Sequence, residues 1–178
     1  CLDAGDWPDV WLGRLSVDSE NDLTEQVAKI LTYEDHPPSS SYYDDVELIA
    51  HRQVENGYIQ CMTDVMNQPG YVPQPSFTLR AGNVAQGTNA NVVADIEAGR
   101  HVVMYRGHGS STGWSSWDWN SSSFSGPVNM GLDNTGRPSI VLNVACTNSG
   151  LDLQGDCLAE RWMENNFGAV ASYGATRS

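Results

Sequence analysis

The sequence has almost no lysine and a large excess of negative charge. Its 178 residues hold 9 Lys and Arg against 22 Asp and Glu, giving a formal net charge of -13, and Lys29 is its one lysine. Proteins that bind the phosphate backbone of nucleic acids need clustered positive charge to release its counterions. The composition therefore disfavours nucleic acid as a partner. An acidic, lysine-poor surface suits an extracellular or saline setting, or is simply well solvated.

Long apolar runs are also missing, and cysteine is scarce. No run approaches the ~18 apolar residues that suggest a membrane span. The four cysteines are too few and too dispersed for a disulfide framework, and none forms a C-x-x-C pair. The lack of Cys/His ligand spacing argues against structural zinc, so each thiol is judged from its own surroundings.

The two ends of the chain lack the features of a complete protein. It begins at Cys1 with no initiator Met, basic n-region or apolar h-region, and it stops at Ser178 after an apolar segment. The length fits one domain that buries about 70% of its unfolded surface. We expect residues 1–178 to form a single domain or subdomain, and to be a fragment of a longer protein.

Apolar runs and helical patterns alternate along the chain. The sequence predicts strands over residues 9–15, 46–50, 77–79, 101–106, 140–144 and 169–173. It predicts helices over residues 19–34, 55–66, 89–98 and 157–165, the first with an apolar stripe of Leu23, Val27, Ile30 and Leu31. Such alternation is typical of the α/β class. We predict a mainly parallel sheet with helices on both faces.

Two of the predicted strands end in reactive residues. His108 lies between two glycines just after strand 101–106, and Cys146 follows strand 140–144. Ligands bind beyond the carboxyl ends of parallel strands, and adjacent strands lie about 5 Å apart. Between these strands lies the segment 110–136, rich in Trp, Ser, Gly and Asn, which is unusually long for a structureless insert. Such loops often build substrate walls.

A thiol and an imidazole suffice for acyl transfer. The thiolate attacks a carbonyl, and the imidazolium stabilises the thiolate and then protonates the leaving amine. Gly107 and Gly109 let a substrate backbone approach His108, and the amides of Gly109 and Cys146 are candidate oxyanion donors. Taken singly, Cys146 is more commonly a buried structural thiol and His108 a turn histidine; together they favour a cysteine-peptidase dyad.

Several segments resemble the gingipain family of cysteine peptidases, the caspase-like C25 type, over nearly the whole chain. They are Val10–Ser16 leading to a helix that ends Tyr33-Glu34, Tyr105–Ser110, Asn143–Cys146, Cys157–Met163 and Ala169–Ala171. The resemblance implies a caspase-like fold, a secreted or cell-surface endopeptidase of bacteria or archaea, catalytic residues at His108 and Cys146, and further domains of the same protein. It also implies that residues 1–178 match the catalytic subdomain.

The sequence departs from the family where an acid orients the histidine. That acid follows the strand matching residues 46–50, and here Glu55 is the nearest one, so it becomes the candidate third catalytic residue. The region where arginine-specific members place their substrate-binding acid is shortened, which leaves the residue preference open. Trp114, Trp117 and Val144 are candidates for a substrate wall, although Trp clusters are as often a local hydrophobic plug.

No cofactor is required by the proposed chemistry. Asp118 with Asn120, or Asp152 with Asp156, are candidates for a structural calcium site of the kind the resemblance implies, and solvated loop acids are the alternative. His36, His51 and His101 lack metal-helix spacing and are assigned to structure or surface. No metal-ligating residue is therefore predicted with a defined role.

Three functions compete. The first is a cysteine endopeptidase that acts on polypeptides through a thioester at Cys146. The second is a sortase-like transpeptidase that passes the acyl group to an amine instead of water. The third is a catalytically silent, caspase-like domain that binds a partner through its Trp-rich loop.

Overall fold

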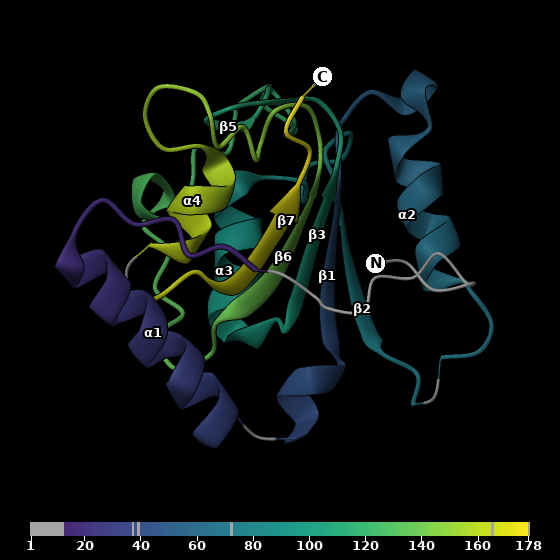
Figure 1. The fold of residues 1–178 in the computed structure, drawn as a ribbon. Coiled ribbons are helices and arrows are strands. Elements are labelled where there is room, and N and C mark those ends of the chain that lie inside the picture. Colours follow the sequence, from purple (N-terminus) through teal and green to yellow (C-terminus); the bar gives the residue numbers. More distant parts are fainter. Residues whose placement is uncertain (1–12, 37, 39, 72, 165, 178) are drawn as a thin grey trace, which may run out of the picture.

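The computed structural model describes residues 13–36, 38, 40–71, 73–164 and 166–177. Its main sheet has five parallel strands in the order β2-β1-β3-β6-β7 (Figure 1). They are β1 (Asp45–Ala50), β2 (Ser76–Ala81), β3 (Val102–Arg106), β6 (Ser139–Val144) and β7 (Ala169–Gly174). Each coincides closely with a run that the sequence predicts as a strand. The prediction of a mainly parallel α/β sheet is confirmed.

Helices cover both faces of this sheet, as predicted (Figure 1). They are α1 (Glu20–Asp35), α2 (Tyr58–Met66), α3 (Asn89–Gly99) and α4 (Leu158–Met163). Residues of α3 and α4 share one core cluster with Val103, Tyr105 and Val141 of the sheet. Met62 of α2 packs with Leu48 and Ala50 on the opposite face. The alternating side chains of the strands thus pack into two separate cores, one on each face of the sheet.

The N-terminal prediction is only partly met. Residues 9–12 of the predicted first strand lie outside the described residues, and residues 13–15 form no strand. Ser19 does cap α1, accepting a hydrogen bond from the Asp22 amide. However, Leu23, Val27 and Leu31 of the apolar stripe are 37–52% exposed, whereas Gln26 and Lys29 are buried. Helix α1 therefore turns polar side chains towards the protein.

The segment 110–136 is folded into the protein rather than left as an open loop. It contributes β5 (Gly113–Trp114), which pairs antiparallel with β4 (Gly109–Ser110), and the 3₁₀ turn η3 (Val128–Met130). Trp114, Trp117 and Phe124 are fully buried in the larger core cluster. The rings of Trp114 and Phe124 stack at 4.3 Å between centroids. This segment forms part of the core over one face of the sheet.

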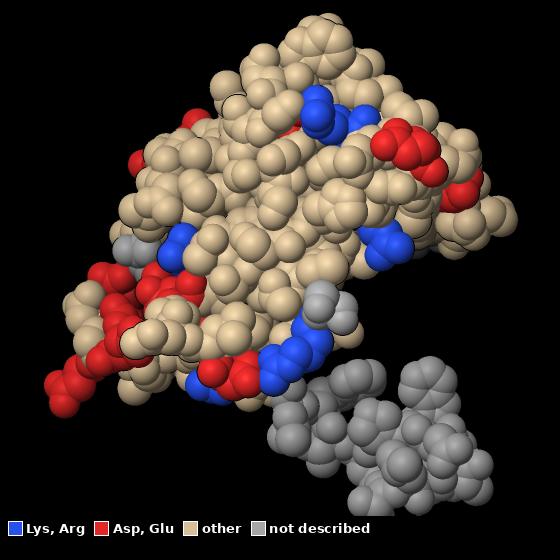
Figure 2. All heavy atoms as spheres, turned by 90° about the horizontal axis from the view of Figure 1, so that it is seen from above, with Lys and Arg blue, Asp and Glu red and all other residues tan. Residues whose placement is uncertain are grey.

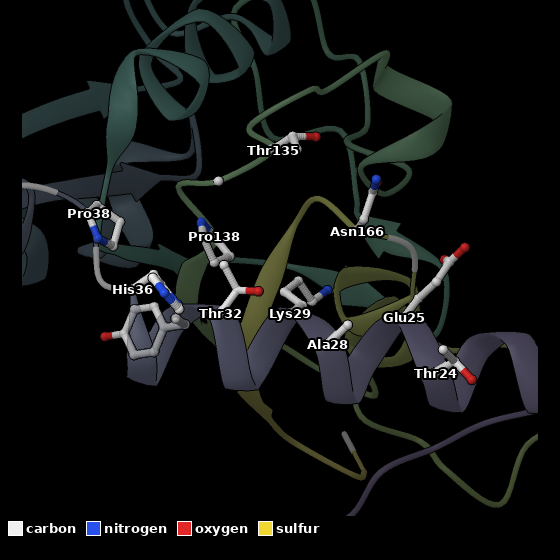
Figure 3. Close-up of a pocket in the computed structure, with 12 residues that line it drawn as sticks. Thr24, Glu25, Ala28, Lys29, Thr32, His36, Pro38, Thr135, Pro138 and Asn166 are labelled. Atoms are coloured by element: carbon white, nitrogen blue, oxygen red, sulfur yellow. The ribbon is translucent and has the colours of Figure 1, made fainter.

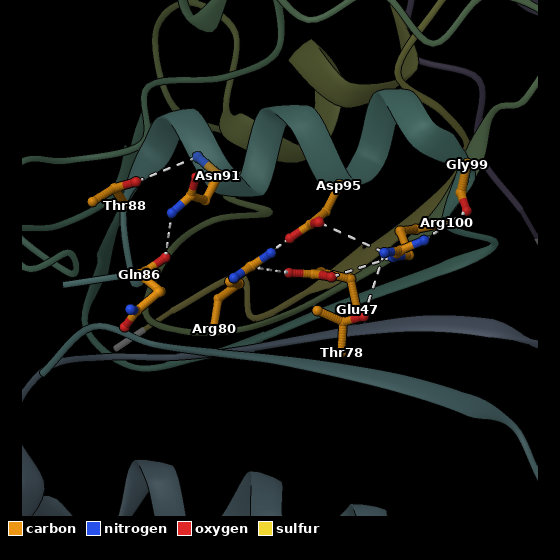
Figure 4. A network of polar contacts seen from close by, with 9 residues as sticks. All are labelled: Glu47, Thr78, Arg80, Gln86, Thr88, Asn91, Asp95, Gly99 and Arg100. Carbon is orange, nitrogen blue, oxygen red and sulfur yellow. Dashed lines mark hydrogen bonds and ion pairs between the residues drawn. The ribbon is translucent and has the colours of Figure 1, made fainter. Parts of the chain in front are cut away.

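A buried ion network joins the sheet to α3 (Figure 4). Glu47 of β1 has no exposed surface and lies 3.4 Å from the Nε of Arg100 and 3.9 Å from the Nε of Arg80. Asp95 of α3 pairs with both arginines, at 2.5 Å and 3.6 Å. Two acids and two arginines from β1, β2, α3 and the residue after α3 thus form one network. Burial, and then the nearby Asp95, raise the pKa of Glu47 to about 8, so all four groups are charged only above that pH.

No described helix is both long and apolar enough to cross a membrane.

Candidate active site

The predicted thiol and imidazole lie on neighbouring strands. β3 and β6 are adjacent and parallel, and their register pairs Arg106 with Val144. His108 and Cys146 each follow that pair by two residues. The amide of Gly107 donates to the carbonyl of Val144 at 3.3 Å, which continues the contact past the strand ends. Both side chains therefore lie at the edge of the sheet where parallel folds bind ligands.

One cavity is lined by both side chains. It has a volume of about 500 Å³, and its lining includes Tyr58, His108, Val144, Cys146 and Tyr173. His108 is exposed and Cys146 is half-buried, with its thiol outside any disulfide. The volume lies in the range of ordinary ligand sites. A thiol and an imidazole thus line the same accessible cavity.

The glycine before His108 is required by packing. A Cβ at Gly107 would collide with the Cβ of His51 and with the hydroxyl of Tyr105. The Tyr105 hydroxyl donates to the carbonyl of His108 at 2.8 Å, and burial raises the pKa of Tyr105, so this hydroxyl stays protonated. A Cβ at Gly109 would lie 2.7 Å from the Cβ of Ala145. Gly107 therefore allows close packing on His51 and Tyr105, and Gly109 allows the segment after His108 to lie close to the cysteine loop.

The turn that carries Cys146 is strained and tied to the histidine side. Thr147 has φ of 54°, a left-handed conformation that a β-branched residue rarely adopts. Asn148 is fully buried, and its side-chain amide donates to the carbonyls of Ser110 and Gly113 at 2.5 and 3.1 Å. Asn148 thus links the cysteine turn to the β4–β5 hairpin that follows His108. Nothing in the sequence pattern singled it out.

The side chain of His108 is bound by an amide. Its Nε2 lies 2.7 Å from the Oε1 of Gln53, which comes three residues after β1. Because an amide oxygen only accepts, this contact places the proton on Nε2 and leaves Nδ1 available as a base. Gln53 occupies the part of the chain where the sequence predicted an orienting acid.

Glu55 is not that partner, which corrects the prediction. It lies in the exposed 3₁₀ turn η2 (Val54–Asn56), whereas the imidazole of His108 is hydrogen-bonded to Gln53. The sequence prediction considered only carboxylates for this position, and the partner is the amide of Gln53, two residues before Glu55. The position after the end of β1 indicated correctly where the partner of His108 lies. The requirement that this partner carry a negative charge was wrong.

His51 packs against His108 and helps to hold Gln53 in place. It is buried, its Nδ1 accepts from the amide of Gln53 at 3.1 Å, and its Nε2 donates to the carbonyl of Ser115 at 3.1 Å. Its ring lies edge-on to that of His108, with centroids 5.0 Å apart. Burial and then the nearby His108 lower the pKa of His51. His51 is therefore a neutral, structural histidine, as assigned, but one that fixes the backbone of Gln53.

The predicted substrate wall is wrong for two of its three residues. Trp114 and Trp117 have no exposed surface and belong to the core. Their indole NH groups donate to Asn143 and Asn89, which satisfies them inside the protein. Val144 does line the cavity. The hydrophobic plug that the sequence left as an alternative is what the structure shows.

The remaining site predictions have mixed placements. Gly109 lies in β4, paired with Trp114, and Cys146 begins a turn; the oxyanion role of their amides stays a prediction. Cys157 caps α4, and burial raises the pKa of its thiol to about 11, which makes it a poor nucleophile. Cys61 is exposed on α2.

The candidate calcium residues are engaged within the chain. The Oδ1 of Asp118 accepts from the amides of Asn120 and Ser122, and Asp152 pairs with Arg177 at 2.7 Å. In the described part of the chain, no group of three His, Cys, Asp or Glu side chains is placed to hold a metal ion. Calcium binding stays a prediction without support from these side chains.

Comparison with known proteins agrees with this geometry. A sequence model of peptidase family C25 matches residues 1–178. The chain belongs to peptidase family C25. The resemblance drawn from its sequence motifs is thereby confirmed. The caspase-like arrangement of sheet and helices is shared with solved structures of similar fold.

Three solved structures are similar to this C25 chain. The complex of the pro- and mature domains of RgpB from Porphyromonas gingivalis has a TM-score of 0.77 at 24% identity, over 96% of this chain and 41% of that one. The Arg-specific cysteine proteinase gingipain R (RgpB) has a TM-score of 0.72 at 25% identity, over 90% and 38%. A structure described as a protease has a TM-score of 0.73 at 21% identity, over 90% and 35%.

This C25 chain spans about two fifths of the length of these structures. No sequence among the curated proteins matches it significantly.

Proposed function

We propose that this chain carries the catalytic site of a cysteine endopeptidase. The observation that carries the proposal is the placement of Cys146 and His108 at matching positions of adjacent parallel strands, facing one cavity, with His108 bound to Gln53. Membership of peptidase family C25 supports the reaction class.

The reaction begins with proton transfer from the Cys146 thiol to Nδ1 of His108. The thiolate attacks the scissile carbonyl carbon, and the π electron pair moves to the oxygen. Collapse of this adduct breaks the C–N bond, and the imidazolium gives its proton to the leaving amine, which leaves a thioester on Cys146. Water, deprotonated by His108, then hydrolyses the thioester and restores the thiol.

Main-chain groups are proposed to stabilise the oxyanion. The amides of Gly109 and Cys146 lie in the two loops that meet beside the cavity, and amide donors aimed at a developing charge lower the barrier most in a water-poor site. Gln53 keeps the imidazole in one orientation throughout, because its Oε1 can accept from Nε2–H in both the neutral and the charged ring.

A sortase-like transpeptidase would use the same residues and differ only in the acyl acceptor. The competing silent-domain hypothesis rested on a missing orienting residue and on an exposed Trp loop. Gln53 supplies an orienting contact, and Trp114 and Trp117 are buried, which leaves Trp119, 51% exposed, as the one accessible Trp among these three. These two observations favour an enzyme over a binding domain.

The test is mass spectrometry of the chain after treatment with a peptidyl chloromethyl ketone. We expect alkylation at Cys146 that is lost in Cys146→Ala and strongly slowed in His108→Ala. Cys61 is a matched internal control, because its thiol is also free and is exposed. Labelling of Cys61 and Cys146 at equal rates, independent of His108, would contradict the proposal. Incubation of an uninhibited sample with peptide and added amine separates hydrolysis from transpeptidation.

We also propose that the protein acts outside the cell or at the cell surface, on polypeptides, and works with further domains. The acidic, lysine-poor composition and the partial coverage of the solved relatives support these statements. Fractionation of the producing cells, followed by detection of the chain, tests the location.

A further inference from the structure

The cavity that holds Cys146 and His108 is positively charged, although the chain as a whole is strongly acidic. Among the described residues, its lining includes Arg106 and Arg177 and no Asp or Glu, in a chain with a formal net charge of -13. Figure 2 faces the carboxyl ends of the strands and shows acidic side chains gathered at its left end, on the side of α1. The cavity therefore offers a substrate a charge opposite to that of the protein.

The two arginines differ in how their charge is balanced. Arg177 forms two hydrogen bonds with the carboxylate of Asp152, at 2.7 and 2.8 Å. Both side chains of this pair are more than 60% exposed, so the pair is solvated and its charge is largely cancelled. Arg177 thus adds little net charge to the cavity.

The positive charge of Arg106, by contrast, is not balanced by an ion pair within the described chain. Arg106 is half-buried at the end of β3, and among the described residues no carboxylate forms an ion pair with it. Arg80 and Arg100, by contrast, share Glu47 and Asp95. A guanidinium presents a planar fork of donors that matches a carboxylate with two parallel hydrogen bonds. A half-buried guanidinium on a cavity wall without a counter-ion is suited to a carboxylate from outside the chain.

The position of Arg106 relates it directly to the nucleophile. It is in register with Val144, Cys146 follows Val144 by two residues in a turn, and Arg106 and Cys146 line the same cavity. An acidic residue whose carbonyl meets Cys146 carries its carboxylate a few ångströms from that carbonyl, and the Arg106 guanidinium stands at the end of a long side chain. The guanidinium and the thiol therefore lie within the reach of one substrate residue.

We propose that Arg106 makes this site selective for peptides with Asp or Glu on the acyl side of the scissile bond. The inference rests on the proposed function and names its substrate class. It separates this chain from gingipain R, which is described as Arg specific, since a basic side chain would meet the uncompensated charge of Arg106. Binding of the carboxylate needs no proton transfer, so the chemistry of the thioester is unchanged.

The experiment compares the rates at which peptidyl chloromethyl ketones alkylate Cys146 in the full chain. The series differs in one side chain only: Asp, Asn, Glu, Gln, Arg or Leu. We expect Asp over Asn and Glu over Gln by about ten- to a hundredfold, the usual range for a charged hydrogen bond. Arg106→Gln should abolish this ratio while the Leu probe still reacts, and Arg106→Glu should favour the Arg probe.

The matched control is Arg52→Gln. Arg52 is exposed and lies outside the cavity, near Gln53, so the variant makes the same change in net charge without touching the cavity wall. It should keep the preference for Asp and Glu. Reaction of the Leu probe shows that each variant is folded and active.

Two results would overturn the inference alone: equal or faster reaction of the Arg probe in the wild type, or an acid preference that survives Arg106→Gln. Failure of every probe to alkylate Cys146 would remove the proposed function, and this inference with it. The wild-type series decides the substrate class even if an Arg106 variant does not fold.

Discussion

The Nε2 of His108 lies 2.7 Å from the Oε1 of Gln53, so a neutral amide binds the imidazole that the proposed mechanism uses. A carboxylate in this place would both orient the ring and stabilise its positive charge; an amide provides orientation with much less electrostatic stabilisation. The two contributions can therefore be separated experimentally at Gln53.

Gln53→Ala should reduce kcat by about ten- to a hundredfold, because an exposed imidazole without its acceptor samples unproductive orientations. Gln53→Glu should keep the orientation and stabilise the imidazolium, so the limb of the pH–activity profile on which that proton is lost moves to higher pH. Activity profiles from pH 5 to 10 measure both effects. Glu55→Gln is the control: a loss as large as that of Gln53→Ala would make Glu55 the orienting residue.

Asn148 should be needed to keep the two reactive loops together. Replacing it with Ala removes two buried hydrogen bonds to the carbonyls of Ser110 and Gly113, which costs about 1–3 kcal/mol for each acceptor left unsatisfied. We expect a lower thermal midpoint and slower alkylation of Cys146. Asn129→Ala, which removes an exposed side-chain hydrogen bond to Ser125, should change neither; equal effects would deny Asn148 its linking role.

The edge-of-sheet position of the reactive pair could be predicted because it follows from parallel-sheet geometry. Short apolar runs before His108 and Cys146 indicated strands, and strands in one parallel sheet end at the same edge. Their adjacency, β3 beside β6, agrees with the family resemblance. No pattern in the sequence fixes the order of strands.

The sequence predictions fail where the same side chain suits two different environments. The Trp-rich segment suited either a substrate wall or a plug, and only packing against Tyr105 and Trp162 decides for the plug. In α1, most of the apolar stripe is exposed, and polar side chains turn towards the protein. Gln26 donates to the carbonyl of Ser16, and Lys29 to the carbonyls of Met163 and Phe167. Distant carbonyls can thus draw polar side chains inward, and a helical pattern does not contain them.

The ion network of Figure 4 should be important for stability. Glu47→Ala leaves Arg80 and Arg100 with Asp95 alone, and breaking a buried pair in this way costs about 3–5 kcal/mol at pH 9, above the raised pKa of Glu47 of about 8. Denaturant unfolding measures the loss. Asp152→Ala, which breaks the exposed pair with Arg177, should cost at most about 1 kcal/mol. Similar losses in the two variants would show that the network around Glu47 is not effectively buried.

A buried lysine should make the stability of the protein depend on pH. Lys29 lines a cavity of about 300 Å³ between α1 and the segments around Thr135 and Asn166 (Figure 3). Burial lowers the pKa of Lys29 to about 8, opposed by Glu25 and Glu164. In the unfolded chain the same group keeps its ordinary pKa of 10.5, so between these values the unfolded state binds more protons.

The free energy of unfolding should therefore gain a contribution from Lys29 as pH rises from about 8 towards 10.5, by at most about 3 kcal/mol. Lys29→Met removes the titrating group and should remove this contribution. The quantity to measure is the difference in the free energy of unfolding between wild type and variant, from denaturant unfolding at pH 7, 8, 9 and 10. Taking this difference removes the contributions of the tyrosines and Cys157, which are the same in both proteins. A difference that stays constant with pH would show that Lys29 keeps its proton in the folded protein.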